Sequence, residues 1–210
     1  MTPDSIAELA ALAAAVAVRR SWPALGSQHG RIQAAVCVPL QLTARGLEVW
    51  TIKRTDGMRH HAREIAFPGG KRDDGDADLR HTALRELEEE LGVGGEQVRV
   101  LGAMGPFPTA TSRFTLNPYV VLLAEGAAAR PNPAEVAVLI RTPVADFLEG
   151  RVPYRAVELG PGRRSPIFDF AIGSMYGASA HVLDELLRAW AELRRVPYPE
   201  PTLTDRIPWL

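Results

Sequence analysis

The chain has 210 residues, 46% of them hydrophobic and 23% charged, a composition typical of one globular domain or, less often, two small ones. Twenty-four Lys and Arg against 25 Asp and Glu give a net charge of −1, so no overall basic field favours nucleic acid or an anionic membrane as partner. The single cysteine, Cys37, excludes an internal disulfide, and no apolar run is long enough to span a membrane. We therefore expect a cytoplasmic protein with neither nucleic acid nor membrane as a partner.

The first half of the chain predicts helix, strands and helix in turn. Pro3 suits a first helical turn, and an interior rich in Ala and Leu that ends at Arg20 predicts a helix over 3–20, before a loop at 21–30. The elements that follow are strands at 32–42 and 47–53 around a turn at Arg45 and Gly46, a polar loop at 55–64, a short apolar piece at 65–67, and a helix at about 78–91 stopped by Gly92 and Gly94.

The second half alternates short strands with two helices. An amphipathic helix is predicted over 178–195, and the four prolines among the last 14 residues predict an extended or disordered tail from Val196. This mixture is typical of one α/β or α+β domain. The other predicted elements are strands at 98–104, 114–123, 136–141, 152–158 and 165–171, and a short helix at 143–148.

One face of the helix at 78–91 is strongly acidic. At 100° per residue, Glu86, Glu89 and Glu90 fall within about 100° of one another, and leucines form a separate apolar stripe. Like charges at this spacing repel one another, and a hard divalent cation prefers such a cluster of oxygen ligands. Gly69 and Gly70, just before the helix, allow backbone carbonyls to approach the ion. The residues alone leave two interpretations open, a divalent-metal site and a solvated acidic face.

This segment resembles the Nudix box, a family pattern that reads G-x5-E-x7-R-E-U-x-E-E-x-G-U, with U an aliphatic residue. The second half of the pattern is matched at every fixed position by Arg85, Glu86, Leu87, Glu89, Glu90, Gly92 and Val93. The first half departs from it, because Arg85 comes one residue late when counted from Gly70 and Asp76 stands in place of the first glutamate. In the family that acidic residue pairs with the arginine, so the resemblance implies that Asp76, or else Asp73 or Asp74, supports Arg85.

The segment before the box is similar to the motif of the coenzyme A pyrophosphatases, which ends R-x3-G-x3-F-P-G-G. The match consists of Arg59, Phe67, Pro68, Gly69 and Gly70 at the right spacing, with Arg63 in place of the first glycine. Residues 175–183 resemble a further segment of this branch, W-G-x-T-A-x-x-L. Box and upstream segment together cover about 51–93.

The resemblance implies a fold and a domain organisation. The expected fold is α/β, a Nudix-type α/β/α sandwich in which a mixed central sheet lies between helices, with extra N- and C-terminal helices. We expect a single Nudix hydrolase domain over 1–195, comprising an N-terminal helical extension at 1–24 and a core with its C-terminal helix at 31–195. A proline-rich extended tail would occupy 196–210. A homodimer through the terminal helices is a further expectation.

The resemblance also implies a reaction, the hydrolysis of coenzyme A or its derivatives to 3′,5′-ADP and 4′-(acyl)phosphopantetheine. Mg²⁺ or Mn²⁺ would be bound by Glu86, Glu89, Glu90 and the carbonyl of Gly69. Glu86 would take the proton of the attacking water, and Arg85 would orient the carboxylates. The catalytic residues implied are therefore Glu86, Arg85 and Glu89, and no organic cofactor is expected.

The basic loop before the glycines suits a phosphate-rich nucleotide substrate. Arginine makes bidentate contacts with phosphate, and coenzyme A carries a pyrophosphate and a 3′-phosphate. His60 and His61 are equally well interpreted as ordinary polar loop residues. The substrate-binding residues that the resemblance implies are Arg59, Arg63, His61, Phe67 and Gly70.

Three alternative functions stay open. In the first, the protein is a Nudix pyrophosphatase whose substrate is another nucleoside diphosphate derivative, such as ADP-ribose, NADH or a dinucleoside polyphosphate. A nucleotide-binding Nudix module without turnover is a weaker alternative, because such modules usually lose box glutamates that this chain keeps. An acidic-helix interaction domain would have no activity at all. We interpret Glu135 as a helix- or strand-entry residue, although the family often draws an extra acidic ligand or base from this part of the chain, and His181 as a structural histidine. Residues 109–113 read equally as a plain turn or a pocket-lining loop.

Overall fold

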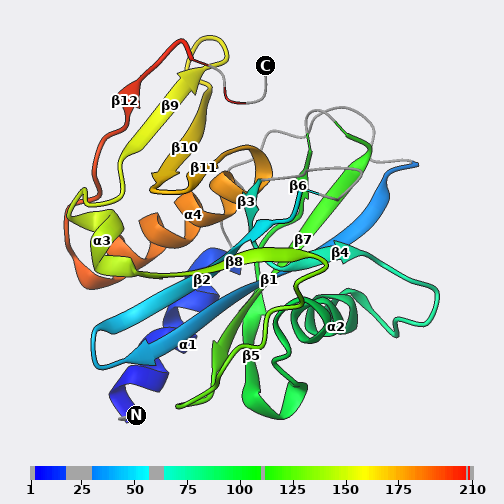
Figure 1. Ribbon diagram of the computed structural model, residues 1–210. Helices are drawn as coiled ribbons and strands as arrows, with labels where there is room; N and C mark the ends of the chain where they lie inside the picture. The colour runs from blue at the N-terminus through cyan, green and yellow to red at the C-terminus, as the bar shows by residue number, and fades with distance from the viewer. Residues whose placement is uncertain (1–2, 18–29, 57–63, 110–111, 207, 209–210) are drawn as a thin grey trace.

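The computed structural model describes residues 3–17, 30–56, 64–109, 112–206 and 208 (Figure 1). The predicted N-terminal helix is present as α1 (Pro3–Ala17) to the end of the first described range. The predicted loop at 21–30, apart from Gly30, and most of the predicted loop at 55–64 lie outside the described residues.

An eight-stranded sheet occupies the centre of the molecule, in the order β3-β2-β1-β7-β5, with β4 paired to β1, β6 to β7 and β8 to β2. The pair β1–β7 is parallel and the other pairs are antiparallel, so the sheet is mixed, as expected. Its strands are β1 (Ile32–Thr43), β2 (Gly46–Arg54), β3 (Ile65–Ala66), β4 (Gly69–Lys71), β5 (Val98–Ala103), β6 (Phe107–Pro108), β7 (Phe114–Leu123) and β8 (Val136–Pro143).

Both faces of this sheet are apolar, as the central strand shows. On β1, Val36 and Val38 belong to one buried cluster, while Ala35 and Cys37 belong to another on the opposite face. Successive side chains of a strand point to opposite faces, so a strand that is apolar throughout needs a cover on each side. Burial raises the pKa of the Cys37 thiol, so this side chain behaves as a small hydrophobe.

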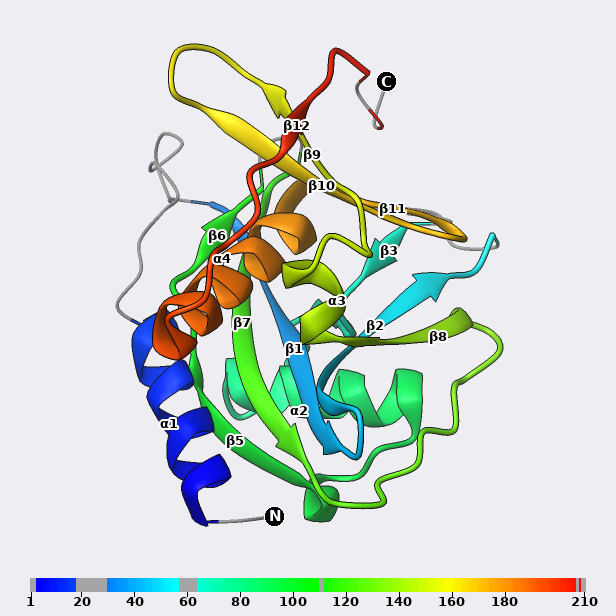
Figure 2. The ribbon, with the colours of Figure 1, turned by 90° about the vertical axis from the view of Figure 1, so that its left-hand side faces the viewer.

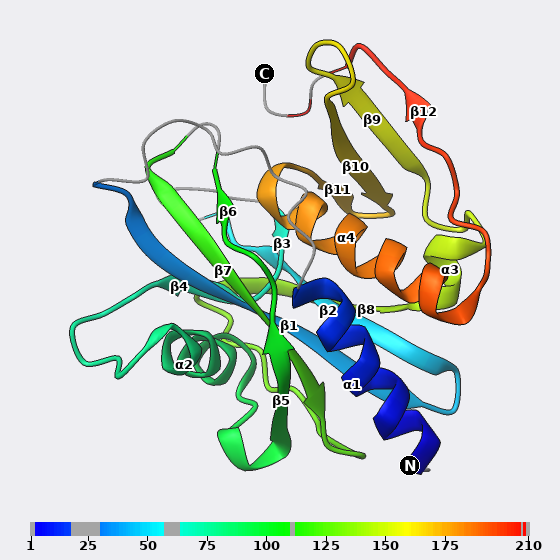
Figure 3. The ribbon, with the colours of Figure 1, turned by 180° about the vertical axis from the view of Figure 1, so that it is seen from behind.

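Helices supply the two covers (Figure 1 and Figure 3). On one face lies α2 (Leu79–Leu91), which buries Leu87 and Leu91 completely. On the other face lie α1 and α4 (Gly177–Arg194), and these two helices also contact each other. This arrangement confirms the α/β/α sandwich with additional N- and C-terminal helices.

The helix α2 begins and ends at the residues that its sequence predicts. The side chain of Asp78 accepts a hydrogen bond from the backbone N–H of His81, which caps the first turn. Gly92 ends the helix in the left-handed conformation at φ 64°, where a side chain would be strained. The box helix is therefore fixed at both ends by its own sequence.

A second, four-stranded sheet lies beyond α4, in the order β11-β10-β9-β12 (Figure 2). The sequence predicts two of its strands but assigns them to a single mixed sheet. The described part of the tail is extended, which is one of the two forms that the sequence predicts. Within it, β12 pairs in parallel with β9. The remaining elements are the 3-10 turn at Gly95–Gln97, α3 (Val144–Leu148), β9 (Tyr154–Glu158), β10 (Arg164–Phe170), β11 (Gly173–Met175) and β12 (Thr202–Leu203).

Candidate active site

The glycine strand β4 brings the backbone directly against the box helix. An added Cβ at Gly70 would lie 2.3 Å from the Oε1 atom of Glu86, and one at Gly69 would lie 2.5 Å from the carbonyl oxygen of Ala35. At Gly69 the closest atom belongs to the backbone of β1, so no side chain fits there. At Gly70 the close atoms are the carboxylate end of Glu86, so a side chain there would displace Glu86 from its position.

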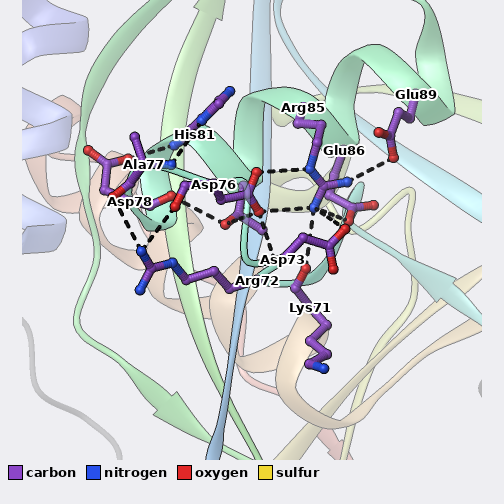
Figure 4. Close-up of polar contacts among 11 residues, drawn as sticks. Lys71, Arg72, Asp73, Asp76, Ala77, Asp78, His81, Arg85, Glu86 and Glu89 are labelled. Atoms are coloured by element: carbon purple, nitrogen blue, oxygen red, sulfur yellow. Dashed lines mark hydrogen bonds and ion pairs between the residues drawn. The ribbon is translucent and has the colours of Figure 1, made fainter.

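Arg85 is the centre of the polar network on this helix (Figure 4). Its Nε atom lies 3.0 Å from Oδ1 of Asp76, its Nη2 atom 2.9 Å from Oε1 of Glu86, and its Nη1 atom 2.8 Å from Oε2 of Glu89. Nη2 also donates to the carbonyl oxygen of Lys71 at 3.3 Å. The guanidinium group thus links three carboxylates to the end of the glycine strand, which fixes their relative positions.

Asp76 is the acidic residue that supports Arg85, as the first of the three candidates expected from the sequence. It is buried, and its Oδ2 atom accepts hydrogen bonds from Thr82 Oγ1 at 2.8 Å and from the backbone N–H of Asp73 at 3.0 Å. The Arg85 guanidinium holds the pKa of the Asp76 carboxyl well below its usual range. Asp73 and Asp74 are both exposed, and the carboxylate of Asp73 lies 3.8 Å from Arg85. The one-residue shift in the box is therefore absorbed by a buried aspartate.

Glu90 is fully buried, unlike its two neighbours on the acidic face. Its Oε1 atom lies 2.8 Å from Nη1 of Arg54, and its Oε2 atom accepts a hydrogen bond from the backbone N–H of Gly69 at 3.0 Å. Burial raises the pKa of Glu90 to about 7, against the opposing effects of Arg54 and the Gly69 N–H, and the charges of Glu86 and Glu135 raise it further. A carboxyl group in this state changes its charge near neutral pH.

Glu86 also has a raised pKa. Burial is the main cause, the Arg85 charge opposes it, and the negative charges of Glu89 and Glu135 add to it. A raised pKa moves a carboxylate toward the range in which it acts as a general base. The side chain of Glu86 is 13% exposed and that of Glu89 52% exposed, so Glu86 is the more enclosed of the two.

Arg54 was not singled out from the sequence, and Glu135 was interpreted as a helix- or strand-entry residue in preference to an extra acidic ligand or base. Arg54 lies 36 positions before Glu90, and no spacing rule connects a strand end to a helix at that distance. Glu135 enters β8, as we expected, since Thr55 N–H donates to its carbonyl oxygen and its own N–H donates to Asn132. The same position also brings its negative charge close enough to raise the pKa of two helix glutamates, which the strand-entry interpretation does not include.

The donors present fit a hard divalent cation in kind, since they are carboxylates beside a glycine backbone. In the described part of the chain, however, no three His, Cys, Asp or Glu side chains are already gathered as metal ligands. Instead these carboxylates are paired with arginines, since Arg85 contacts one oxygen each of Glu86 and Glu89 and Arg54 contacts one of Glu90. A cation would join a set of carboxylates that the arginines hold in place.

The predicted substrate residues are placed only in part. Arg59, His61 and Arg63 lie outside the described residues, as does His60. Phe67 is 2% exposed and belongs to the core cluster beneath α4, so its side chain packs and offers no surface to a ligand in this structure. Gly70 is half-buried against Glu86, at the edge where a substrate would meet the box helix.

The segments that resemble the coenzyme A pyrophosphatases lie next to one another. The hydroxyl of Tyr176 donates to Oε1 of Glu64 at 3.1 Å, and β11 contacts β3. His181 is half-buried, and removal from solvent lowers its pKa to about 4, so it stays neutral, consistent with a structural role. In the loop at 109–113, the guanidinium of Arg31 donates to the carbonyl oxygens of Thr109 and Ser112, which fastens the described part of that loop.

Comparison with known proteins identifies the family. The NUDIX domain profile matches residues 31–159. The Nudix hydrolase NudL of Pectobacterium atrosepticum, itself described as uncharacterized, is 38% identical over 122 residues, which cover 58% of this chain and 62% of the relative. The match thus spans less than two thirds of that protein. NudL of Citrobacter koseri, also uncharacterized, is 32% identical over 163 residues, or 77% of this chain and 84% of the relative.

Solved structures agree with the fold. A Caenorhabditis elegans Ap4A hydrolase in a binary complex has a TM-score of 0.51 at 15% identity, covering 78% of this chain and 98% of the other. A MutT/nudix family protein from Enterococcus faecalis has the same TM-score at 13% identity, covering 84% of this chain and 66% of the other. Among the described residues, no helix is both long and apolar enough to cross a membrane. By its sequence match and its fold, the chain belongs to the Nudix family.

Proposed function

We propose that the protein is a divalent-metal-dependent pyrophosphohydrolase that cleaves coenzyme A or its derivatives to 3′,5′-ADP and 4′-(acyl)phosphopantetheine. The observation that carries the proposal is the position of Glu86. Its side chain lies against Gly70, and Arg85 forms ion pairs with it and with Asp76 and Glu89. A family member without turnover would have no need for this complete set of acidic residues and its supporting arginine.

The reaction breaks one P–O bond of the pyrophosphate and forms a new one to a water oxygen. Glu86 accepts the proton of that water, which its raised pKa favours. Arg85 and its buried partner Asp76 keep Glu86 and Glu89 in position. Glu86, Glu89, Glu90 and the Gly69 carbonyl would hold Mg²⁺ or Mn²⁺, which when bound would neutralise charge on the phosphates and make the water more acidic.

The choice of coenzyme A rests on the motif before the box. Arg59 and Arg63 with His61 would bind the phosphates, and Gly70 would border the pyrophosphate. The contact between Tyr176 and Glu64 supports this choice, because it ties the C-terminal segment of the same branch to the start of β3. The similar NudL proteins carry no substrate in their names, so they support the Nudix chemistry and leave the substrate to the motif.

Product analysis tests this proposal. The protein would be incubated with Mg²⁺ or Mn²⁺ and, separately, with coenzyme A, acetyl-coenzyme A, ADP-ribose, NADH and a dinucleoside polyphosphate, and the products identified by mass spectrometry. We expect 3′,5′-ADP from the coenzyme A compounds at a higher kcat/KM than any other substrate. Faster cleavage of another nucleotide would keep the Nudix reaction and replace the substrate, with Arg63 as the first residue to examine.

Absence of turnover with every metal and substrate would contradict the enzymatic proposal and favour a nucleotide-binding module. A cytoplasmic location and a homodimer are further parts of the proposal. Sedimentation equilibrium tests the dimer, and a single species of 22.9 kDa would overturn it.

A further inference from the structure

Arg54 lies where three segments of the site meet. It is the last residue of β2, and the pairing with β8 shifts register between Lys53 and Arg54. Its backbone N–H donates to the carbonyl oxygen of Glu64, and the next residue donates to that of Glu135. Bulges of this kind redirect a side chain relative to its strand and are common beside active sites. This one lies at the residue whose guanidinium reaches across to the box helix.

The side chain of Arg54 determines how Glu90 is held. Both are largely enclosed, with 13% of the arginine side chain and none of the glutamate side chain exposed. The Arg54 guanidinium takes Oε1 at 2.8 Å, while the Gly69 N–H takes Oε2 at 3.0 Å. A carboxylate fixed through both oxygens from two different strands has a single orientation on the helix.

The two arginines of the site divide its carboxylates between them. Arg85, which belongs to the box, contacts Glu86 and Glu89, whereas Arg54 contacts Glu90 and comes from outside the box. Their partners differ in access to solvent, because the Arg85 set reaches the surface and Glu90 does not. The helix glutamate that is hardest to hydrate therefore depends on a residue that the family pattern of the box does not contain.

We propose that Arg54 is a second positioning residue of the site, which orients the Glu90 carboxylate so that it can act as a metal ligand. This inference rests on the proposed function, since it assumes that the acidic cluster binds a divalent cation. In this role Arg54 acts through its ion pair with Glu90. Residues that hold a metal ligand in this way typically change metal affinity by 10- to 100-fold when they are removed.

A purely structural ion pair would behave differently. Replacing one partner of a buried pair destabilises the fold, while replacing both partners is often neutral for stability. Stability alone therefore cannot separate the two roles. The affinity for metal in the absence of substrate can, because a pair that only fastens β2 to α2 has no reason to alter it once folding is accounted for.

The test measures Mn²⁺ binding by isothermal titration calorimetry on the full chain without substrate. The variants are Arg54→Gln, Arg54→Lys and, as a matched control, Arg155→Gln, which removes a partly exposed arginine paired with Asp169 on the second sheet. We expect Arg54→Gln to bind Mn²⁺ 10- to 100-fold more weakly, Arg54→Lys to stay within about fivefold of wild type, and Arg155→Gln to be unchanged. Circular dichroism would establish that each variant is folded.

A second comparison keeps the inference testable if Arg54→Gln folds poorly. In the Glu90→Gln background both buried charges can be removed together, and the variant Arg54→Gln/Glu90→Gln should bind Mn²⁺ as Glu90→Gln alone does. A further drop in the double variant, or wild-type affinity in Arg54→Gln, would overturn the role of Arg54 and leave the proposed function intact. If the wild-type protein binds no Mn²⁺, it is the proposed function that fails.

Discussion

Two polar networks in this protein each contain an arginine, and their charges balance differently. On α4, the Oδ1 atom of Asp184 accepts hydrogen bonds from Tyr154 and Tyr198 at 2.8 and 2.7 Å, and its Oδ2 atom accepts one from Arg188 at 2.8 Å. One carboxylate there meets one guanidinium and two hydroxyls. On α2, by contrast, the one guanidinium of Arg85 lies within ion-pair distance of four carboxylates, those of Asp73, Asp76, Glu86 and Glu89.

The consequence of this difference is visible in the pKa values. In the network on α4, burial and the nearby carboxylate raise the pKa of both tyrosines, so the hydroxyls stay protonated and keep donating. On α2 burial is the main cause of the raised pKa values of Glu86 and Glu90, the paired arginines oppose it, and neighbouring carboxylates add to it. A balanced network fastens elements together, whereas an unbalanced one is suited to bind a cation.

The largest difference between the two networks should appear when one carboxylate in each is replaced by the corresponding amide. We expect Glu86→Gln to lower kcat by at least about 100-fold, the size typical of losing a general base, with little change in melting temperature. Asp184→Asn should do the reverse, with activity within threefold of wild type and a lower melting temperature. Kinetics and thermal unfolding of the two variants provide the measurement, and a stable, fully active Glu86→Gln protein would contradict the assignment.

The raised pKa of Glu90 on α2 should make the stability of the protein depend on pH. Because the folded-state pKa of Glu90 is raised from 4.5 to about 7, its contribution to stability is fully present below pH 4.5 and is lost as the pH rises through 7. Without metal, the free energy of unfolding of wild type relative to Glu90→Gln should therefore fall by about 3 kcal/mol between pH 4.5 and 8. Urea unfolding in the presence of a chelator measures it, and a difference that rises with pH would reverse the argument.

Removing the support of Arg85 should have a smaller effect. Asp76→Asn keeps the size of the side chain but removes the charge that holds the Nε atom of Arg85. We expect kcat to fall roughly tenfold, the lower end for a residue that acts through another. Asp73→Asn is the matched control, because its exposed carboxylate lies 3.8 Å from the same guanidinium. Equal effects of the two variants would show that Asp76 has no special role.

The smallest expected effect belongs to the tail. Tyr198→Phe deletes one hydrogen bond to Asp184 and leaves the ring beneath Arg188, so stability should fall by about 1 kcal/mol without loss of activity. Chemical unfolding gives the value. A large loss of activity in this variant would mean that the tail and the site are coupled, which the balanced network does not predict.

Local patterns in the sequence carry most of what could be predicted. The helix α2 was predicted within one residue because Asp78 and Gly92 mark its ends, and β7 was predicted over its full length. The strand β4 was not predicted, since two glycines have low strand propensity and pair there only because β1 lies beside them.

Contacts between distant segments account for what was missed. The partnership of Arg54 and Glu90 depends on the packing of β2 against α2 and has no local signal. The separation of β9 and β10 from the main sheet is decided by the placement of α4 between the sheets, which strand propensity does not report. Local sequence patterns thus predicted the box and Arg85, whereas the ion pair between Arg54 and Glu90 arises from tertiary packing.

The single cysteine gives the molecule an internal reporter. Cys37 lies fully buried on the central strand, between the hydrogen bonds that join β1 to its neighbours. Its side chain packs in the cluster that Leu87 and Leu91 of α2 cover, so a thiol reagent can reach it only after that cover has opened. The rate of labelling at low reagent concentration therefore follows the opening equilibrium of this part of the core, and the rate at high concentration follows the opening step itself.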